Sequence, residues 1–149
     1  MPASLLHRVI VPVANEDDAR ATCGAICSHF DDDATTLYVV HIIEKGSGAP
    51  DKAPLEARQE QAQQIFAIAE DTFEETEYDL VTDLRYATNI TDEIIAAVEE
   101  RDATAITFIP RPSGTFTRLL TGNKTKKLVS TNSVPVIVLP RPTDQSNTT

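Results

Sequence analysis

The stretch His7–Val13 (HRVIVPV) is rich in β-branched residues and ends at a polar cluster, so it predicts a buried strand. Asn15 follows as a helix cap, and the next three residues are acidic, which suits the positive end of a helix. Thr35–Ile43 (TTLYVVHII) predicts a second buried strand. A strand, a helix and another apolar strand in this order indicate a parallel pair.

The rest of the chain continues the alternation of apolar strands and helical segments. A long amphipathic helix, a helix capped by Asn89 or Thr91 and a short third helix separate the remaining strands. These helices are predicted over Leu55–Glu75, 91–102 and Gly122–Thr131, and the strands over Tyr78–Tyr86, Thr104–Ile109 and Val134–Leu139. We therefore expect a Rossmann-like α/β fold, with a five-stranded parallel sheet and helices on both faces. A single domain is expected over residues 1–140, with a polar tail over 141–149.

Composition excludes several classes of protein. The chain has 149 residues, the size of one domain, and 41% of them are apolar. Its two cysteines cannot build a disulfide framework, and no apolar run approaches the roughly 18 residues of a membrane span. We therefore expect a cytoplasmic protein that is not embedded in a membrane. The net charge of −10 disfavours nucleic acid as a partner and suits a salt-loving organism.

The charge is distributed unevenly along the chain. Residues 1–102 carry 22 acidic and 7 basic side chains, whereas residues 103–149 carry one acid and six bases. Lys124 and two further lysines fall near the start of the predicted helix that Gly122 opens, where they oppose the helix dipole. A bound phosphate would reverse that penalty by accepting the free N–H groups. The pattern leaves two interpretations: a local anion site, or solvated lysines beside a helix start that Asn123 alone caps.

The most specific part of the sequence is its C-terminal block, in which Arg118–Gly122 (RLLTG) is followed by a helix and then by Val134–Val138 (VPVIV). With the strand–helix order and the length, this block makes residues 8–140 resemble the universal stress protein family. The resemblance implies a five-stranded fold of the adenine-nucleotide α-hydrolase type and a role in stress resistance. It also implies homodimers that pair through the last strand, here Val134–Leu139.

Nucleotide-binding members of that family carry a glycine motif that this chain does not keep. The motif reads glycine, two residues, glycine, nine residues, and then glycine followed by serine or threonine. Counting back from Gly122 places Ile109 and Pro112 at the first two glycines, and Asn123 stands at the serine or threonine. Glycine lets a backbone approach a phosphate, whereas proline fixes φ and removes a donor. Gly114 is nearby but two places out of register.

A second departure follows the first strand, where the ATP-binding members have an aspartate that contacts the adenine and this chain has Ala14. We therefore expect a regulatory protein that binds ATP weakly or not at all, with a small anionic ligand as an option. The alternative is an adenine-nucleotide switch or slow ATPase, in which Ala14 and Ile42 line the base and a rewritten loop holds ATP or AMP. The candidate residues of that loop are Arg111, Gly114, Gly122, Asn123, Lys124 and Thr125.

The other polar residues favour structural interpretations. Cys23 and Cys27 fall on the inward face of the first helix, and His29 lies about 200° round from Cys27, so we expect two buried thiols and no metal site. His41 is expected to complete a hydrogen bond rather than to contact a nucleotide. The four glutamines between residues 59 and 64 are expected to form a solvated helix face. No side-chain pattern resembles a catalytic triad, so the sequence does not indicate an enzyme.

Overall fold

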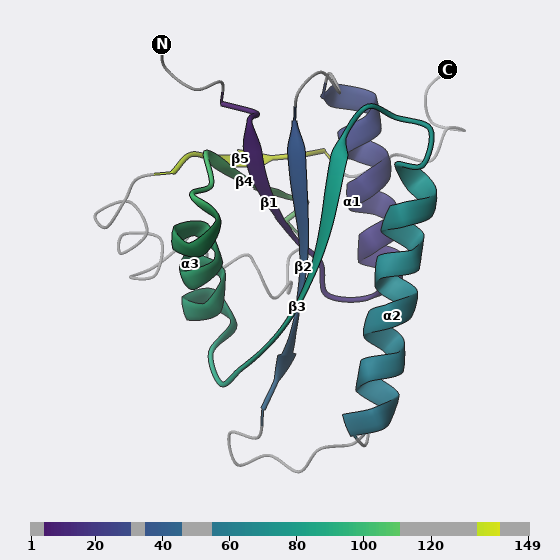
Figure 1. Ribbon diagram of the computed structural model, residues 1–149, viewed down its shortest axis with the longest axis vertical. Helices are drawn as coiled ribbons and strands as arrows, with labels where there is room; N and C mark the ends of the chain where they lie inside the picture. Colours follow the sequence, from purple (N-terminus) through teal and green to yellow (C-terminus); the bar gives the residue numbers. More distant parts are fainter. Residues whose placement is uncertain (1–4, 31–34, 46–54, 111–133, 141–149) are drawn as a thin grey trace.

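The computed structural model describes residues 5–30, 35–45, 55–110 and 134–140. Within these ranges, helices pack on both faces of a five-stranded parallel sheet (Figure 1). The helices are α1 (Glu16–His29), α2 (Leu55–Thr72) and α3 (Ile90–Arg101). The strands are β1 (Arg8–Pro12), β2 (Thr36–Glu44), β3 (Asp79–Ala87), β4 (Ala105–Phe108) and β5 (Val136–Val138). The expected α/β fold is confirmed, and each strand end lies within two residues of its predicted bound.

The sheet order is β3-β2-β1-β4-β5, and all neighbouring strands are parallel. The chain moves outward from β1 through β2 to β3, and it then returns to the other side of β1 to form β4. Strand order therefore reverses between β1 and β4, and ligands of open α/β sheets bind beyond the carboxyl ends of strands at such a point. The predicted helix Gly122–Thr131 and the predicted tail 141–149 lie outside the described residues.

Two hydrophobic cores cover the sheet, as the apolar runs of β1, β2 and β4 predict. Helices α1 and α2 pack on one face and α3 packs on the other (Figure 1). Side chains of β1 alternate between the two cores, with Val9 and Val11 in the α1–α2 core and Ile10 in the α3 core. All three are fully buried. This two-sided packing fixes the positions of the strand ends, where the loops that could bind a ligand begin.

Helices α1 and α3 both begin at asparagine caps. The side-chain oxygen of Asn15 accepts a hydrogen bond from the Asp18 N–H at 2.8 Å. The side-chain oxygen of Asn89 accepts from the Asp92 N–H at 2.9 Å, so Asn89 and not Thr91 caps α3. Such caps satisfy N–H groups that have no partner inside the helix, and each contributes about 1 kcal/mol to stability.

The two cysteines of α1 differ in exposure, so the expectation of two buried thiols is wrong for one of them. Cys23 is buried in the α1–α2 core, and this burial raises the pKa of its thiol to about 12. Cys27 is exposed, although Phe30 beyond it still packs against this core, because Cys27 lies about 80–100° round the helix from the buried Ala19 and Ile26. The described residues include no group of three or more side chains that could hold a metal ion.

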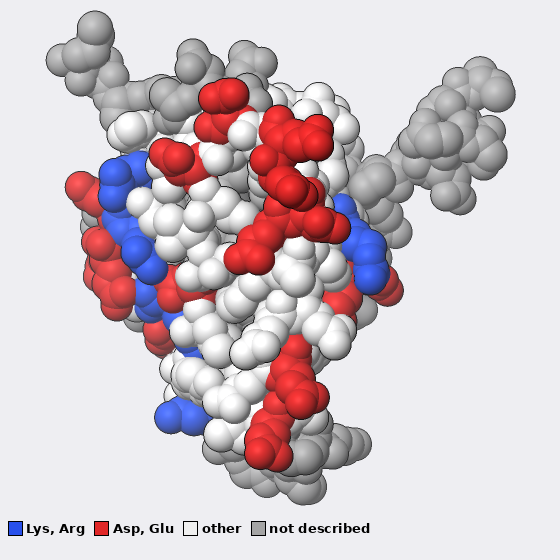
Figure 2. All heavy atoms as spheres, turned by 45° about the vertical axis from the view of Figure 1, so that its right-hand side comes forward, with Lys and Arg blue, Asp and Glu red and all other residues white. Residues whose placement is uncertain are grey.

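The surface on the α2 side of the molecule is predominantly acidic. Figure 2 shows Asp and Glu side chains outnumbering Lys and Arg on this face. The exposed acids of α2 are Glu56, Glu60, Glu70 and Asp71. No helix in the described part of the chain has both the length and the apolar character needed to cross a membrane.

Candidate functional site

A pocket of about 190 Å³ lies at the carboxyl ends of β1 and β2. Val13 and Ala14 follow β1, and the end of β2 contributes the run His41–Glu44. The remaining lining residues are Arg58 and Gln61 from α2 and Ile90 from the start of α3. Ala14 and Ile42, the two residues predicted to line a base, therefore lie in one pocket. The predicted loop residues Arg111, Gly114, Gly122, Asn123, Lys124 and Thr125 lie outside the described residues.

The pairing of β1 with β2 brings the two predicted residues together. The strands run in parallel register up to Pro12 and Val40. The Val13 N–H donates to the Val40 carbonyl oxygen at 3.0 Å and extends this pairing beyond the end of β1. The two strands therefore end at the same edge of the sheet. The pocket is built from the residues at and directly after these ends.

His41 forms a wall of the pocket, and only 7% of its surface is exposed. Its Nδ1 lies 3.0 Å from the carbonyl oxygen of Val13. Burial lowers the pKa of His41, although the hydrogen bond to Val13 and the Glu16 carboxylate act in the opposite direction. The ring is therefore neutral near pH 7. The expectation that His41 completes a hydrogen bond is confirmed.

The N-terminus of α1 borders the pocket, and its own acidic side chains occupy it. The buried carboxylate of Asp18 accepts from the Ala14 N–H at 2.8 Å and from the Thr22 hydroxyl at 3.1 Å. Asn15 satisfies a further N–H group of the first turn. Free N–H groups at a helix start form an anion site, and here the chain's own oxygens take that role. A phosphate at this corner would also meet the charge of Asp18.

Gln61 and Arg58 form the polar side of the pocket, and sequence reasoning did not identify them. The Gln61 amide nitrogen donates to the Glu16 carboxylate at 3.0 Å, which lowers the pKa of Glu16. Arg58 donates to the main-chain carbonyl oxygen of Glu44. The three-residue spacing of Arg58 and Gln61 places them one above the other on a helix face, and that spacing is the signal that could have found them.

The glutamines of α2 are therefore not one solvated face. Gln63 and Gln64 are exposed, as expected. Gln61 instead lines the pocket, and the Gln59 amide donates to the Tyr86 hydroxyl of β3 at 2.8 Å. Gln63 and Gln64 thus face solvent, whereas Gln59 and Gln61 contact neighbouring elements.

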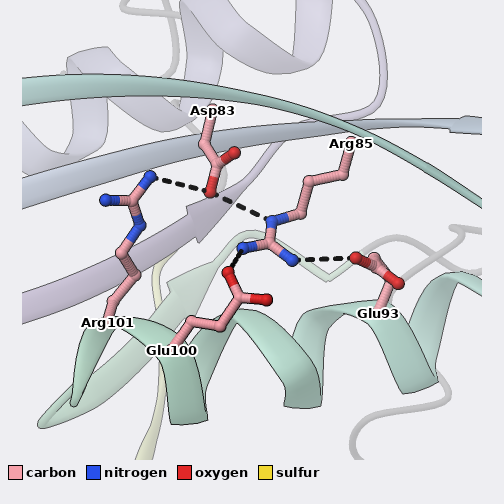
Figure 3. Close-up of polar contacts among 5 residues, drawn as sticks. All are labelled: Asp83, Arg85, Glu93, Glu100 and Arg101. Atoms are coloured by element: carbon pink, nitrogen blue, oxygen red, sulfur yellow. Dashed lines mark hydrogen bonds and ion pairs between the residues drawn. The ribbon is translucent and has the colours of Figure 1, made fainter.

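A second polar group, the Arg85 cluster, lies between β3 and α3 and comprises Asp83, Arg85, Glu93, Glu100 and Arg101 (Figure 3). Arg85 lies 3.0 Å from Asp83 and 2.8 Å from Glu93, and it also contacts Glu100. Burial acts to lower the pKa of Arg85, but the hydrogen bonds to these three carboxylates outweigh it and raise the pKa. Because the donors of Arg85 are used within the chain, the cluster ties α3 to the sheet rather than offering a ligand site.

The strand order and the pocket beyond β1 and β2 define an α/β protein of the kind that binds ligands at the edge of a parallel sheet. The family model described as the universal stress protein family matches residues 6–140. The chain therefore belongs to the universal stress protein family.

Solved structures of the family share this fold. A protein of the universal stress protein family from Burkholderia pseudomallei has a TM-score of 0.67 and 16% identity, covering 93% of this chain and 99% of that chain. The universal stress protein from Archaeoglobus fulgidus in complex with dAMP has a TM-score of 0.50 and 20% identity, covering 91% and 99%. A universal stress protein in complex with cAMP has a TM-score of 0.52 and 14% identity, covering 93% of this chain and 100% of that chain. No curated protein sequence matches the chain.

Proposed function

We propose that this chain is a cytoplasmic, homodimeric regulatory protein of stress resistance that binds ATP weakly or not at all. Membership of the universal stress protein family supports the role as a stress protein. The position of Ala14 is the observation that supports weak or absent binding of ATP. This residue lies in the pocket and supplies no carboxylate to a base, at the place where ATP-binding members have an aspartate.

The charges around the pocket also support weak binding of a polyphosphate. Among the described residues, Glu16 and Glu44 lie at the pocket with one guanidinium, that of Arg58, and Asp18 occupies the start of α1. His41 adds no charge near pH 7, because burial lowers its pKa. The described part of the site therefore repels an anion more than it attracts one. The acidic excess of the chain further suits a protein that works at high salt.

A gain-of-function variant tests this proposal. We expect calorimetric titration to show no micromolar binding of ATP or AMP to the wild-type protein. Ala14→Asp should raise the affinity for AMP by about tenfold or more, because a hydrogen bond to a charged group contributes roughly 1.5–3 kcal/mol. Ala67→Asp is the matched control, since it adds the same charge at an exposed position of α2. Micromolar ATP binding by the wild-type protein would contradict the proposal.

The alternative function is an adenine-nucleotide switch or slow ATPase. It is favoured by the presence of a pocket beside the point where strand order reverses, and by relatives solved with dAMP and cAMP. In this case Arg111 and Lys124 would neutralise the phosphates. Lys124→Ala combined with Arg111→Ala should then abolish ATP binding, and an unchanged affinity would exclude this assignment.

The homodimer is proposed to form through Val134–Leu139. Support comes from β5, which is an edge strand of the sheet and leaves Val138 47% exposed. An exposed apolar edge favours pairing with another strand. Val138→Lys should shift the protein to monomer in sedimentation equilibrium. Leu5→Lys is the control, because Leu5 is also 47% exposed but lies outside the sheet. A monomeric wild-type protein would refute the dimer.

A further inference from the structure

We propose that the pocket selects an uncharged ligand group that donates hydrogen bonds, and that Nε2 of His41 accepts from this group. The inference rests on the proposed function, because it assigns a ligand chemistry to the same pocket. With Ala14 at the end of β1, the carboxylate acceptor of ATP-binding members is missing. The acceptors that remain at the pocket include the neutral ones of His41 and Gln61, together with the carboxylate of Glu44.

The hydrogen bond of His41 fixes which ring nitrogen carries the proton. Nδ1 lies 3.0 Å from the Val13 carbonyl oxygen, and a carbonyl oxygen can only accept. Nδ1 must therefore be the donor. In a neutral imidazole the other nitrogen then has a free lone pair, so Nε2 of His41 is an acceptor.

This acceptor opens into the pocket. Among the described residues, the enclosed side-chain nitrogens and oxygens without a hydrogen-bond partner include only Nε of Arg101. Nε2 of His41 is not one of these enclosed atoms and has no hydrogen-bond partner among the described residues. Because His41 lines the pocket and is otherwise buried, we infer that Nε2 faces the pocket.

Gln61 provides a second neutral acceptor. Its amide nitrogen donates to the Glu16 carboxylate, so its amide oxygen remains for a ligand. The other walls include the apolar side chains of Val13, Ile42 and Ile90. At about 190 Å³ the pocket is smaller than the roughly 300–1,000 Å³ that drug-sized ligands occupy. A pocket of this size, with mixed polar and apolar walls and two neutral acceptors, suits a single ring system bearing an amine or a hydroxyl group.

Protonation of His41 would remove the acceptor, because an imidazolium donates from both nitrogens. The charged groups near His41 are Glu16 of α1, Arg58 of α2 and Glu44 at the end of β2, with Asp18 buried behind Ala14. Burial lowers the pKa of His41 and Arg58 acts in the same direction, while the Val13 hydrogen bond and Glu16 act against them. Ligand affinity should therefore be full at neutral pH and fall in acid.

Two substitutions of His41 separate its two hydrogen bonds. His41→Asn retains an amide donor near Nδ1 but has no acceptor at the place of Nε2, whereas His41→Gln places an amide oxygen near Nε2 and does not titrate. Adenosine, which carries an exocyclic amine, is the first probe. Inosine is the second, because it has a carbonyl oxygen at that place and the same ribose hydroxyls. Binding is measured by calorimetric titration from pH 8 to pH 5, with a melting scan to confirm that each variant folds.

We expect adenosine to bind the wild-type protein at pH 7.5 and to lose affinity only well on the acid side of about pH 6.5, the ordinary pKa of histidine, because burial lowers the pKa of His41. His41→Asn should bind adenosine about tenfold more weakly, the equivalent of one lost hydrogen bond. His41→Gln should bind without the loss in acid. Weaker inosine binding identifies the amine as the donor, and equal binding of both probes with equal loss in His41→Asn identifies a ribose hydroxyl.

The inference is overturned if neither nucleoside binds, or if His41→Asn binds both as tightly as the wild-type protein does. Absence of nucleoside binding leaves the weak-ATP proposal intact, whereas micromolar ATP binding refutes that proposal without deciding the role of His41. A wild-type measurement covers the case in which a variant does not fold. In ¹⁵N NMR, adenosine should shift the Nε2 resonance of His41 and leave Nδ1 unchanged, and an unmoved Nε2 would overturn the assignment.

Discussion

The Arg85 cluster and the His41 pocket both place polar side chains against the sheet, but only one of them closes its hydrogen bonds within the chain. Arg85 is 9% exposed and meets three carboxylates, of which Asp83 is also shared with Arg101. In the pocket, Nε2 of His41 and the amide oxygen of Gln61 have no donor among the residues that the structure describes. A completed network is structural, whereas an incomplete one beside a cavity can bind a ligand.

The Arg85 cluster has one open hydrogen-bonding group, and an aromatic ring compensates for it. Nε of Arg101 is enclosed without a hydrogen-bond partner among the described residues. The guanidinium carbon of Arg101 lies 5.0 Å from the centre of the Tyr38 ring. A guanidinium over a ring face is attracted electrostatically, which offsets part of the cost of burying this unpaired Nε–H. Nε of Arg101 is therefore enclosed by protein, whereas Nε2 of His41 lies at a cavity.

Removal of Arg85 should produce the largest effect. Arg85→Met would leave three carboxylates together without their shared partner, and breaking a buried ion pair from one side costs about 3 kcal/mol. Urea denaturation should show this as a loss in the free energy of unfolding. The control is Arg20→Met, because the Arg20–Asp17 pair is 62% and 87% exposed and should contribute at most about 1 kcal/mol.

This prediction separates a structural cluster from a ligand site. If Arg85→Met destabilised the protein no more than Arg20→Met does, the network would be no more than a surface arrangement. We also expect adenosine affinity to be unchanged in Arg85→Met, since the cluster does not line the pocket.

Removal of Asp18 should have an intermediate effect. Asp18→Ala would leave the Ala14 N–H and the Thr22 hydroxyl without their buried acceptor, at a cost of about 2 kcal/mol. Asn89→Ala, which removes only the α3 cap, should cost about 1 kcal/mol. Chemical denaturation of both variants gives the comparison, and an equal loss would mean that the carboxylate acts only as a cap. Asp18→Ala should also strengthen sulfate binding, because it frees the start of α1.

The sequence predicted the strands well, because β1, β2, β4 and β5 are apolar runs rich in β-branched residues between polar segments, while β3 alternates imperfectly between apolar and polar residues. It also placed Ala14 and Ile42 at the ligand edge, since both come at the ends of parallel strands. Arg58 and Gln61 could not be assigned in this way. Their position at the pocket depends on how α2 is rotated and shifted against the sheet, which is a property of tertiary packing.

The Arg85 cluster was missed for a different reason. Acidic residues are so frequent in this chain that no carboxylate stands out, and a pairing between β3 and α3 becomes visible only when the two elements pack. Cys27 shows the opposite error, because its four-residue spacing from Cys23 predicted burial, although Cys27 lies at the edge of the face that α1 buries. Periodicity gives the direction of a side chain but not the extent of the surface that covers it.

The smallest expected effect is the pH dependence that His41 gives to stability. Because its pKa is lower in the folded protein than in the unfolded chain, the stabilisation is complete above about pH 6.5 and is lost as the pH falls through the folded pKa. Comparison of unfolding free energies between pH 7.5 and pH 5 should show a smaller decline in His41→Gln than in the wild-type protein. The exposed His29 provides the control, and His29→Gln should retain the wild-type decline. If the unfolding free energy declined equally with pH in the wild-type and His41→Gln proteins, protonation of His41 would cost the folded protein nothing. Nε2 of His41 would then be exposed to water and not kept for a ligand.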